Sequence, residues 1–341
     1  MRAPDTGAAK ATGASPQAAA EKRKKSAQAR RLVDDIAQRH FGERARNIVA
    51  RNGGLTNSVF EFKVSKGEFI VRTHENATKI NDYLKEQWAM DAARAAGVPT
   101  PHVLEVGNFA DGRPYMIAER IRGSDGCTAP LRLALAESLG RAAARLHTVR
   151  TQGFGPVFDW SSNKLSRHET WGSWMASGFG VERRLAILMK HRMIDRRQCT
   201  RLRRIGAAMA GWRKRPVLHQ GDLRLKNAIV GADGSLLSIL DWETCVSTPG
   251  PFWDLSLALH DLGIDEKEAF LAGYGMNRRA FEAVLPFVRF FNVLNYAPAV
   301  EHQAKAEEPG RPRPAAPATP GRAGSLPDLS GPALRACVRR E

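Results

Sequence analysis

A short β-hairpin pattern interrupts the helical pattern of the second half of the chain, and it constrains the fold more than any other feature. Two apolar runs flank an Asp-Gly turn within residues 228–240. Asp222 and Asn227 lie just before the hairpin, and Asp241 follows it directly. Because a hairpin returns the chain to its starting point, we expect Asp241 to lie beside Asp222 and Asn227.

The first part of the chain has a different pattern. Alternating apolar residues over Val59–Val64 and a second apolar run at Phe69–Val71 predict another hairpin. A helical pattern covers about Asn81–Ala96, and two short strands are predicted at Val103–Val106 and Tyr115–Glu119. Together these elements predict a small antiparallel β lobe that contains one helix.

The rest of the chain is mostly helical by pattern. One helical face carries four apolar residues, which are Leu135, Leu139, Ala142 and Leu146. Further helices are predicted at about residues 168–190, 195–213, 252–262, 265–273 and 278–302. We therefore predict an α+β fold of two lobes, in which the small β lobe meets a larger, mainly helical lobe near residues 119–126.

Both ends of the chain differ in composition from its middle. Of the net charge of +17, residues 1–31 carry +6 and residues 303–341 carry +3. Seven prolines fall between Pro309 and Pro332, with few residues that could form a core. The abrupt change after residue 308 fits a native disordered tail, an altered reading frame or a truncated final helix. The predicted divisions are a disordered basic tail (1–30), an N-terminal lobe (31–122), a C-terminal lobe (123–304) and a disordered Pro/Arg-rich tail (305–341).

The positive net charge of the chain bears on its possible partners, and other sequence features bear on its cellular location. The run Lys22–Lys25 could contact nucleic acid or an anionic membrane, but such a run is more often a solvated arm. No RNA-binding or helix-turn-helix signature accompanies it, so we expect no nucleic-acid partner. The chain lacks a secretory h-region and a run of about 18 apolar residues, so we expect no membrane segment. Its four cysteines form no CxxC pair, which predicts reduced thiols in the cytoplasm.

The polar residues around the hairpin fit phosphoryl transfer. This reaction needs a carboxylate at the attacking hydroxyl and oxygen ligands that hold Mg²⁺ against the phosphates of ATP. Asp222 suits the first task as a catalytic base. Asn227 and Asp241 suit the second, because Mg²⁺ prefers hard oxygen ligands from few protein groups. The alternative is that Asp222 and Asn227 stabilise turns and Asp241 caps a helix, but the joint occurrence of all three favours a site.

The segment that carries these polar residues resembles that of a known family. His219 to Asn227, followed by Asp241-Trp242-Glu243, is similar to the catalytic loop HGDxxxxN and the metal motif DW[ED] of the aminoglycoside phosphotransferase and choline kinase-like family. These enzymes are relatives of the protein kinases, and the resemblance spans about residues 45–300. One departure is that Gln220 stands where the family has His, and His219 lies one residue earlier. This departure puts the packing of the loop, and thereby activity, in question.

The resemblance implies a bilobal protein-kinase-like fold and a nucleotide site between the lobes. It implies that the Gly-rich loop lies near the ATP phosphates, with Gly54, Thr56, Asn57 and Ser58. Arg72 stands where protein kinases carry Lys, and it would bind phosphate oxygens and pair with Glu86. The backbone of Glu119 and Ile121 would face the adenine. Asp254 would either hold the catalytic loop or cap a helix. ATP and Mg²⁺ are the implied cofactors.

The resemblance further implies transfer of the γ-phosphate to a hydroxyl of a small molecule, but it leaves the acceptor open. Gly153–Pro156 with Trp171 and Trp174 resembles the hygromycin branch, although aromatic residues are more often core. Residues 165–213 are strongly basic, which suits a polycationic aminoglycoside poorly unless acids such as Asp261, Asp265, Glu266 and Glu268 face the cleft. The alternatives are an aminoglycoside or hygromycin-like antibiotic, a metabolic hydroxyl compound (choline-like, sugar or amino alcohol), or a weakly active nucleotide-binding protein.

Overall fold

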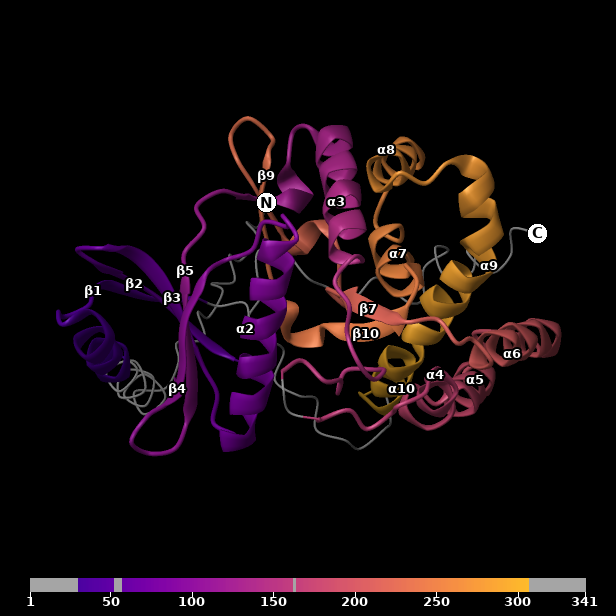
Figure 1. The fold of residues 1–341 in the computed structure, drawn as a ribbon, viewed down its shortest axis with the longest axis horizontal. Coiled ribbons are helices and arrows are strands. Elements are labelled where there is room, and N and C mark those ends of the chain that lie inside the picture. Colours follow the sequence, from indigo (N-terminus) through magenta and orange to yellow (C-terminus); the bar gives the residue numbers. More distant parts are fainter. Residues whose placement is uncertain (1–29, 52–56, 162–163, 307–341) are drawn as a thin grey trace, which may run out of the picture.

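A five-stranded antiparallel sheet dominates the first part of the chain (Figure 1). The computed structural model describes residues 30–51, 57–161 and 164–306. The strands lie in the order β1-β2-β3-β5-β4, and their bounds are Arg46–Arg51 (β1), Ser58–Val64 (β2), Gly67–Thr73 (β3), Val103–Asn108 (β4) and Pro114–Glu119 (β5). The four strands expected from the sequence are all present, and β1 is an additional edge strand that sequence patterning missed.

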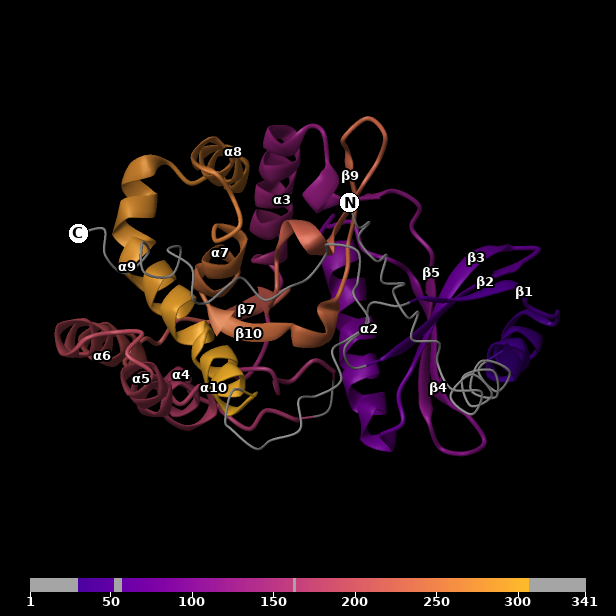
Figure 2. The same ribbon diagram turned by 180° about the vertical axis from the view of Figure 1, so that it is seen from behind.

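Each face of this sheet is covered by a helix. Helix α2 (Ile80–Ala95) lies on the side of the large lobe, in Figure 1 and in the reverse view of Figure 2. A helix at residues 30–41, which the sequence did not predict, packs on the other face. Alternate residues of β5 reach the two cores, because Ile117 packs with Ile36 whereas Met116 packs in the same core as Ala89. The sheet is therefore buried on both sides.

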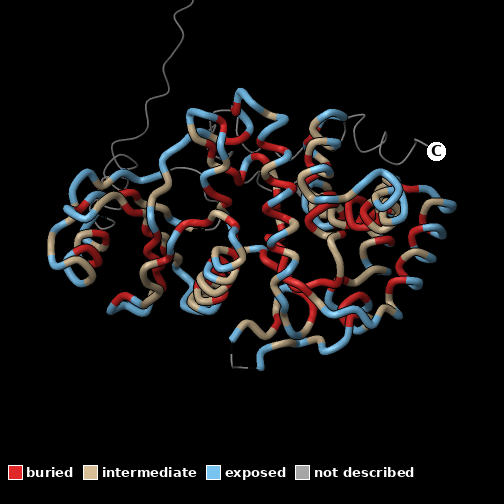
Figure 3. The backbone as a smooth tube through the Cα atoms, turned by 45° about the horizontal axis from the view of Figure 1, so that its top comes forward, coloured by how far each residue is buried: buried red, intermediate tan, exposed pale blue. Residues whose placement is uncertain are grey.

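The large lobe is mainly helical, as predicted. Its helices are α3 (Arg132–Leu146), α4 (Trp171–Ser173), α5 (Val181–Lys190), α6 (Arg196–Ala210), α7 (Phe252–Ala258), α8 (Ile264–Tyr274), α9 (Arg278–Asn295) and α10 (Ala297–Ala306). Helices α3 and α8 cross at close range through two glycines. A Cβ on Gly140 would clash with the Phe270 carbonyl oxygen, and one on Gly273 would clash with that of Glu137. Buried residues run through both lobes (Figure 3).

The single helix expected at residues 168–190 is wrong. Three elements replace it, namely α4, a π-helical turn at Trp174–Gly178 and α5. Gly180 has a φ of 69°, in the left-handed region that favours glycine, and this ends the helical path before α5 begins. A Cβ on Gly178 would clash with the Trp174 ring, so the chain turns tightly over this buried side chain.

Two small sheets frame the segment that carries the polar residues. Strand β7 (Pro216–His219) pairs with β10 (Val246–Pro249), and β8 (Ala228–Val230) pairs with β9 (Leu236–Ile239) and with β6 (Ser124–Asp125). The predicted hairpin at residues 228–240 is thus present, while the partner of β7 was not foreseen. Short 3₁₀ turns complete the fold: η1 (Ala77–Lys79), η2 (Gly126–Thr128), η4 (Leu225–Asn227) and η5 (Trp242–Thr244).

One helical stretch, Arg278–Lys305, is long and apolar enough to cross a membrane by length and composition, with a mean hydropathy of 1.2. It comprises α9 and α10. Phe290, Phe291 and Leu294 of this stretch are almost fully buried in the core of the large lobe. Such packing is typical of a core helix, which passes the same test.

Candidate active site

The loop between β7 and β8 brings Asp222 and Asn227 together, as the sequence predicted. The amide nitrogen Nδ2 of Asn227 donates to the backbone carbonyl of Asp222 at 2.8 Å and to its Oδ2 at 3.1 Å. Lys226 Nζ lies 2.6 Å from the same Oδ2. Because the nitrogen of the Asn227 carboxamide is committed to Asp222, its oxygen is the atom left to meet a cation.

The β8–β9 hairpin returns Asp241 to this loop. The N–H of Leu240 donates to the Asn227 carbonyl at 2.7 Å, which fixes the neighbouring Asp241 beside it. Asp241 itself has φ 58° and ψ 64°, a left-handed conformation that is uncommon for a residue other than glycine. Burial raises the pKa of its carboxyl, and the nearby Arg72 works against that shift. The strained backbone holds this carboxylate within the electrostatic influence of Arg72 and Asp222.

Gln220 joins the two ends of the hairpin. Its side chain is fully buried, and its Nε2 donates to the carbonyl oxygens of Leu240 at 3.0 Å and Asp241 at 2.7 Å. Its Oε1 accepts the N–H of Asp222 at 2.8 Å. A carboxamide offers two donors and one acceptor here, whereas a neutral imidazole has one of each. Gln220 thus stands where His was expected, and its side chain is hydrogen-bonded to the backbone of both Asp222 and Asp241.

Asp254 holds the start of the same loop from α7. Its Oδ2 accepts the N–H of Gln220 at 3.0 Å, and its Oδ1 accepts that of Gly221 at 2.9 Å. Gly221 has a φ of 91°, and a Cβ there would clash with the Thr244 carbonyl, so only glycine fits between these segments. Of the two roles expected for Asp254, the geometry supports anchoring of the loop.

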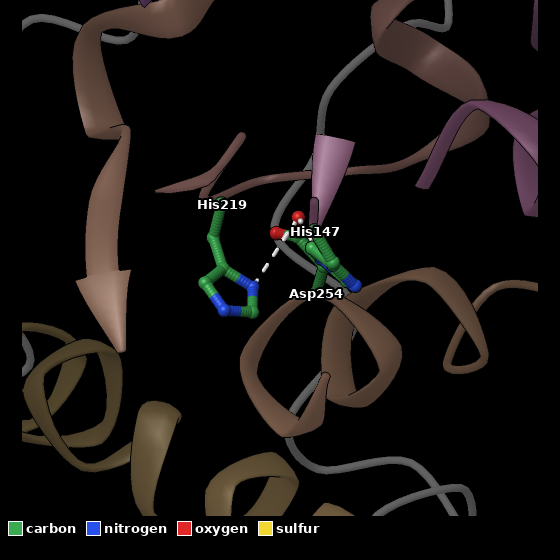
Figure 4. Close-up of side chains that lie close together, drawn as sticks. All are labelled: His147, His219 and Asp254. Atoms are coloured by element: carbon green, nitrogen blue, oxygen red, sulfur yellow. Dashed lines mark hydrogen bonds and ion pairs between the residues drawn. The ribbon is translucent and has the colours of Figure 1, made fainter. Parts of the chain in front are cut away.

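Two histidines surround Asp254 (Figure 4). His147 Nε2 lies 3.2 Å and His219 Nδ1 lies 3.5 Å from Asp254 Oδ2. Burial of the carboxyl acts to raise its pKa, but these neighbours outweigh that effect and the pKa of Asp254 is lowered. Burial lowers the pKa of His147 to about 4, so this ring is neutral at pH 7. The displaced His219 therefore supports the anchor of the loop rather than the loop itself.

Arg72 and Glu86 form the expected pair between β3 and α2. Arg72 Nη1 lies 2.6 Å from Glu86 Oε2, and Glu86 is fully buried. Burial raises the pKa of Glu86 despite the opposing effect of Arg72. Burial alone would lower the pKa of Arg72, yet Glu86 outweighs this and the net shift is upward. The pair places a guanidinium 3.5 Å from Glu243 of the large lobe.

Glu243, the third residue of the DW[ED] motif, is where the large lobe meets the small lobe. Its carboxylate lies 2.5 Å from Lys79 Nζ and 3.5 Å from Arg72 Nη2, and it accepts from Asn57 Nδ2 at 3.2 Å. Asn57 in turn accepts the hydroxyl of Tyr83 at 2.7 Å. Three small-lobe side chains therefore converge on one carboxylate that closely follows Asp241.

Lys85 ties α2 to the large lobe. This buried side chain donates to three backbone carbonyls, those of Pro156 at 3.2 Å, Glu243 at 3.4 Å and Cys245 at 3.4 Å. Carbonyl oxygens can hold a buried ammonium only if they are well aimed, since an unpaired one is costly. Lys85 thus fixes the helix that carries its neighbour Glu86 against the segment that follows Asp241.

For the other residues that were predicted to bind the nucleotide, the structure gives less information. Gly54 and Thr56 lie outside the described residues, and Ser58 begins β2 at an exposed position. The N–H of Glu119 donates to the His102 carbonyl at 2.8 Å, so the expected contact of the Glu119 backbone with adenine would use its carbonyl and stays a prediction. Among the described residues no hydrogen bond engages the N–H of Ile121, which leaves it as the donor of this strand end.

This arrangement can be compared with known proteins. A family model described as "Phosphotransferase enzyme family" matches residues 47–291. The chain belongs to this family of phosphotransferase enzymes. A comparison with curated protein sequences found no match.

Solved structures of similar fold are aminoglycoside phosphotransferases. The apo form of a thermostable mutant of APH(4)-Ia has a TM-score of 0.59 at 15% identity, and the match covers 80% of this chain and 93% of that one. A further variant of that thermostable protein, in a ternary complex with ADP and hygromycin B, has a TM-score of 0.60 at 15% identity, covering 80% and 92%. The GDP complex of aminoglycoside 2'-phosphotransferase-IIIa has a TM-score of 0.59 at 13% identity, covering 82% and 93%. At these identities the likeness establishes the kinase-like fold.

Of the four acids that the sequence offered to a polycationic acceptor, two are already paired, while Asp265 and Glu268 are exposed. Asp261 forms a two-point ion pair with Arg224, at 2.5 and 2.9 Å, and Glu266 pairs with Arg132. Arg224 also lies 3.9 Å from Asp222. The aromatic residues that resemble the hygromycin branch, Trp171 and Trp174, are buried core residues.

Sequence reasoning missed three residues of this site. Gln220 was noted only as a departure from the family, and Lys79 and Lys85 were not singled out. The contacts of Gln220 with Leu240 and of Lys79 and Lys85 with Glu243 span 20 to 164 residues, so no local spacing could reveal them. The position of Gln220 immediately before Gly221-Asp222 was the one usable signal.

Proposed function

We infer that this phosphotransferase transfers the γ-phosphate of ATP to a hydroxyl of a small molecule, with Asp222 as the catalytic base. The observation that carries this proposal is the junction of Asp222, Asn227 and Asp241 around Gln220. Asp222 is about one-fifth exposed, so an acceptor hydroxyl can reach its carboxylate. It would orient the hydroxyl and take its proton as the bond to phosphorus forms.

The donor set around the loop fits Mg²⁺. The Asn227 carboxamide oxygen and the Asp241 carboxylate are hard oxygen ligands, and burial that raises the pKa of Asp241 is what a cation would offset. Bound Mg²⁺ would neutralise charge on the ATP phosphates. Arg72, held by Glu86, would bind phosphate oxygens, and the N–H of Ile121 would meet the adenine edge. Asn57, Ser58 and the neighbouring Gly54 and Thr56 would cover the phosphates.

The acceptor candidates divide by charge. An aminoglycoside or hygromycin-like antibiotic is supported by what the similar structures bind. An uncharged or anionic hydroxyl compound is supported by the basic surroundings of Asp222, since Arg224 and Lys226 flank it and Asp261 is already neutralised. We favour the second class, because a polycation would have to displace these pairs to bind. The support that Gln220 gives the loop speaks against a weakly active protein.

The experiment is a transfer assay with purified full-length protein and γ-labelled ATP or GTP. The panel should contain aminoglycosides, hygromycin B, choline, amino alcohols, neutral sugars and hydroxy acids. Label on neutral or anionic acceptors, with none on aminoglycosides, is the expected result. Transfer of label to aminoglycosides would favour an antibiotic as the acceptor. Binding of Mg-ATP without any transfer would favour the nucleotide-binding alternative.

Cytoplasmic location and the division into lobes at 31–122 and 123–304 remain our proposals. Free thiols support the first, because all three cysteines among the described residues are unpaired: Cys127, Cys199 and Cys245. The second is supported by the position of residue 122 between β5, in the five-stranded sheet, and β6, which pairs in the large lobe.

A further inference from the structure

We propose that the large lobe carries a second ligand site, for a small aromatic anion, at the end of β7 opposite the catalytic loop. A cavity of about 770 Å³ lies between the start of β7, the start of α4 and the end of α6. Pro216 lines this cavity, whereas His219, at the other end of the same strand, leads into the catalytic loop. In Figure 1 these elements lie on the side of the molecule away from the five-stranded sheet.

The rim of this cavity is cationic and its charges are not compensated. Arg150, Arg213, Lys214 and Arg215 line it, against the single acid Glu169. No ion pair joins any of these four cations to a carboxylate within the described part of the chain, whereas Arg203 and Arg224 nearby in sequence are each paired. Four unpaired cations around one concavity attract an anion, and an anion that binds there meets no ion pair that it must break.

The walls of the cavity are aromatic and rigid. Trp212 is half-buried and is fixed by ring contacts with Phe252 at 5.1 Å and Phe287 at 4.8 Å. Trp171, on the α4 side, is almost fully buried behind the cavity surface and is held by Phe154 and Trp174. The ammonium of Lys214 lies 4.8 Å from the centre of the Trp212 ring, so one of the rim cations is itself held against an aromatic wall of the cavity.

Size and chemistry together define the ligand. A volume of this order falls in the range of about 300 to 1,000 Å³ that is typical of small-molecule sites. Aromatic walls favour a flat apolar body, and the uncompensated rim favours a phosphate, sulfonate or carboxylate attached to it. The site does not depend on the proposed transfer chemistry, because none of the residues that line it belongs to the catalytic loop.

The test is calorimetric titration of the full chain with 1-naphthyl phosphate, in saturating ADP and Mg²⁺ so that the nucleotide cleft is filled. We expect one molecule to bind, and about tenfold weaker binding to the Arg213→Glu/Arg215→Glu variant. The matched control is Arg196→Glu/Arg197→Glu, at the exposed start of α6, which makes the same change of net charge and should leave binding unchanged. 1-Naphthol and inorganic phosphate alone should each bind at least about tenfold more weakly, since each lacks one half of the ligand.

Several results would overturn the proposal. These are no binding of 1-naphthyl phosphate, equal binding to the Arg213→Glu/Arg215→Glu variant, or equal weakening by the control. Equally tight binding of 1-naphthol would remove the role of the cations. Binding of a single-stranded oligothymidylate that is lost in the Arg213→Glu/Arg215→Glu variant, without binding of 1-naphthyl phosphate, would assign the same surface to nucleic acid instead.

Discussion

The proposed catalytic loop and the proposed nucleotide side of the site are held in place in different ways. Gln220 and Asp254 brace the loop from within the large lobe, and both are fully buried. The nucleotide side is assembled across the lobes, where Glu243 meets Arg72 and Lys79. We infer that the loop keeps its geometry whether the lobes open or close, whereas the phosphate side depends on their approach. Loop variants should lower kcat, and variants across the lobes should raise the nucleotide Kd.

The largest effect is expected for Asp241→Asn, which removes the one carboxylate of the proposed metal pair. Turnover should fall at least about 100-fold, because a metal supplies several kcal/mol of charge stabilisation during transfer. The Mg²⁺ concentration for half-maximal turnover should also rise. Rates measured against Mg²⁺ test this, with Asp233→Asn in the exposed hairpin turn as control. Turnover within about threefold of wild type would contradict the metal role.

Gln220→Glu tests whether the loop is braced independently of nucleotide. A carboxylate cannot donate to the carbonyls of Leu240 and Asp241, so the end of the hairpin that carries Asp241 should shift. We expect kcat to fall about 10- to 100-fold, since small misplacements of reacting groups are this costly. The Kd of ADP should change less than about threefold.

Gln220→His, which restores the residue usual in the family, is the matched variant. It should retain more activity than Gln220→Glu, because an imidazole can keep one of the donated bonds. Equal losses in the two variants, or a rise in the ADP Kd as large as the fall in kcat, would break the contrast between loop and cleft.

Lys85→Met tests the contacts between the lobes on the proposed nucleotide side. The variant keeps the length of the side chain but leaves three carbonyls without their donor. The free energy of unfolding should fall by about 1–3 kcal/mol. The ADP Kd should rise about fivefold, because α2 loses its tie to the segment after Asp241. Calorimetry and urea unfolding measure both, with the exposed Lys63→Met as control, and an unchanged Kd would place Lys85 outside the nucleotide side.

The smallest effect concerns His147, which lies beside Asp254, and the loss of folding stability at acid pH. Its pKa of about 4 lies below the value of about 6.5 expected in the unfolded chain, so between these values the unfolded state binds a proton that the folded state does not. Stability should therefore fall as pH drops from 6.5 toward 4, by up to about 3 kcal/mol for this group.

His147→Gln keeps a hydrogen-bonding side chain that does not titrate. Urea unfolding of this variant should depend less steeply on pH between 6.5 and 4 than unfolding of the wild type. Identical slopes would show that His147 does not titrate with folding.

The same contrast explains what the sequence could and could not predict. The proximity of Asp222, Asn227 and Asp241 was predicted because it depends on spacing within one loop and one hairpin. The pair of Arg72 and Glu86 was found through the family pattern. Lys85 was not, because its contacts lie 71 to 160 residues away and leave no local trace.

The fold was predicted where patterns were regular. The hairpin of β2 and β3 and the helix α2 have clear periodicity and agree with the structure to within a few residues. The expected helix at 168–190 failed because Gly178 and Gly180 break it over the buried Trp174. Strand β1 was missed because its residues are mostly exposed and carry no alternation.

The central claim is that Asp222 acts on the acceptor while the rest of the site binds nucleotide, and Asp222→Ala tests it most directly. The measurement pairs turnover of γ-labelled ATP with the calorimetric Kd of ADP, on the same preparation. We predict that turnover falls about 10²- to 10⁴-fold, the usual contribution of a general base, while the Kd changes less than about threefold. Turnover close to that of wild type, with nucleotide still bound, would contradict the assignment of Asp222.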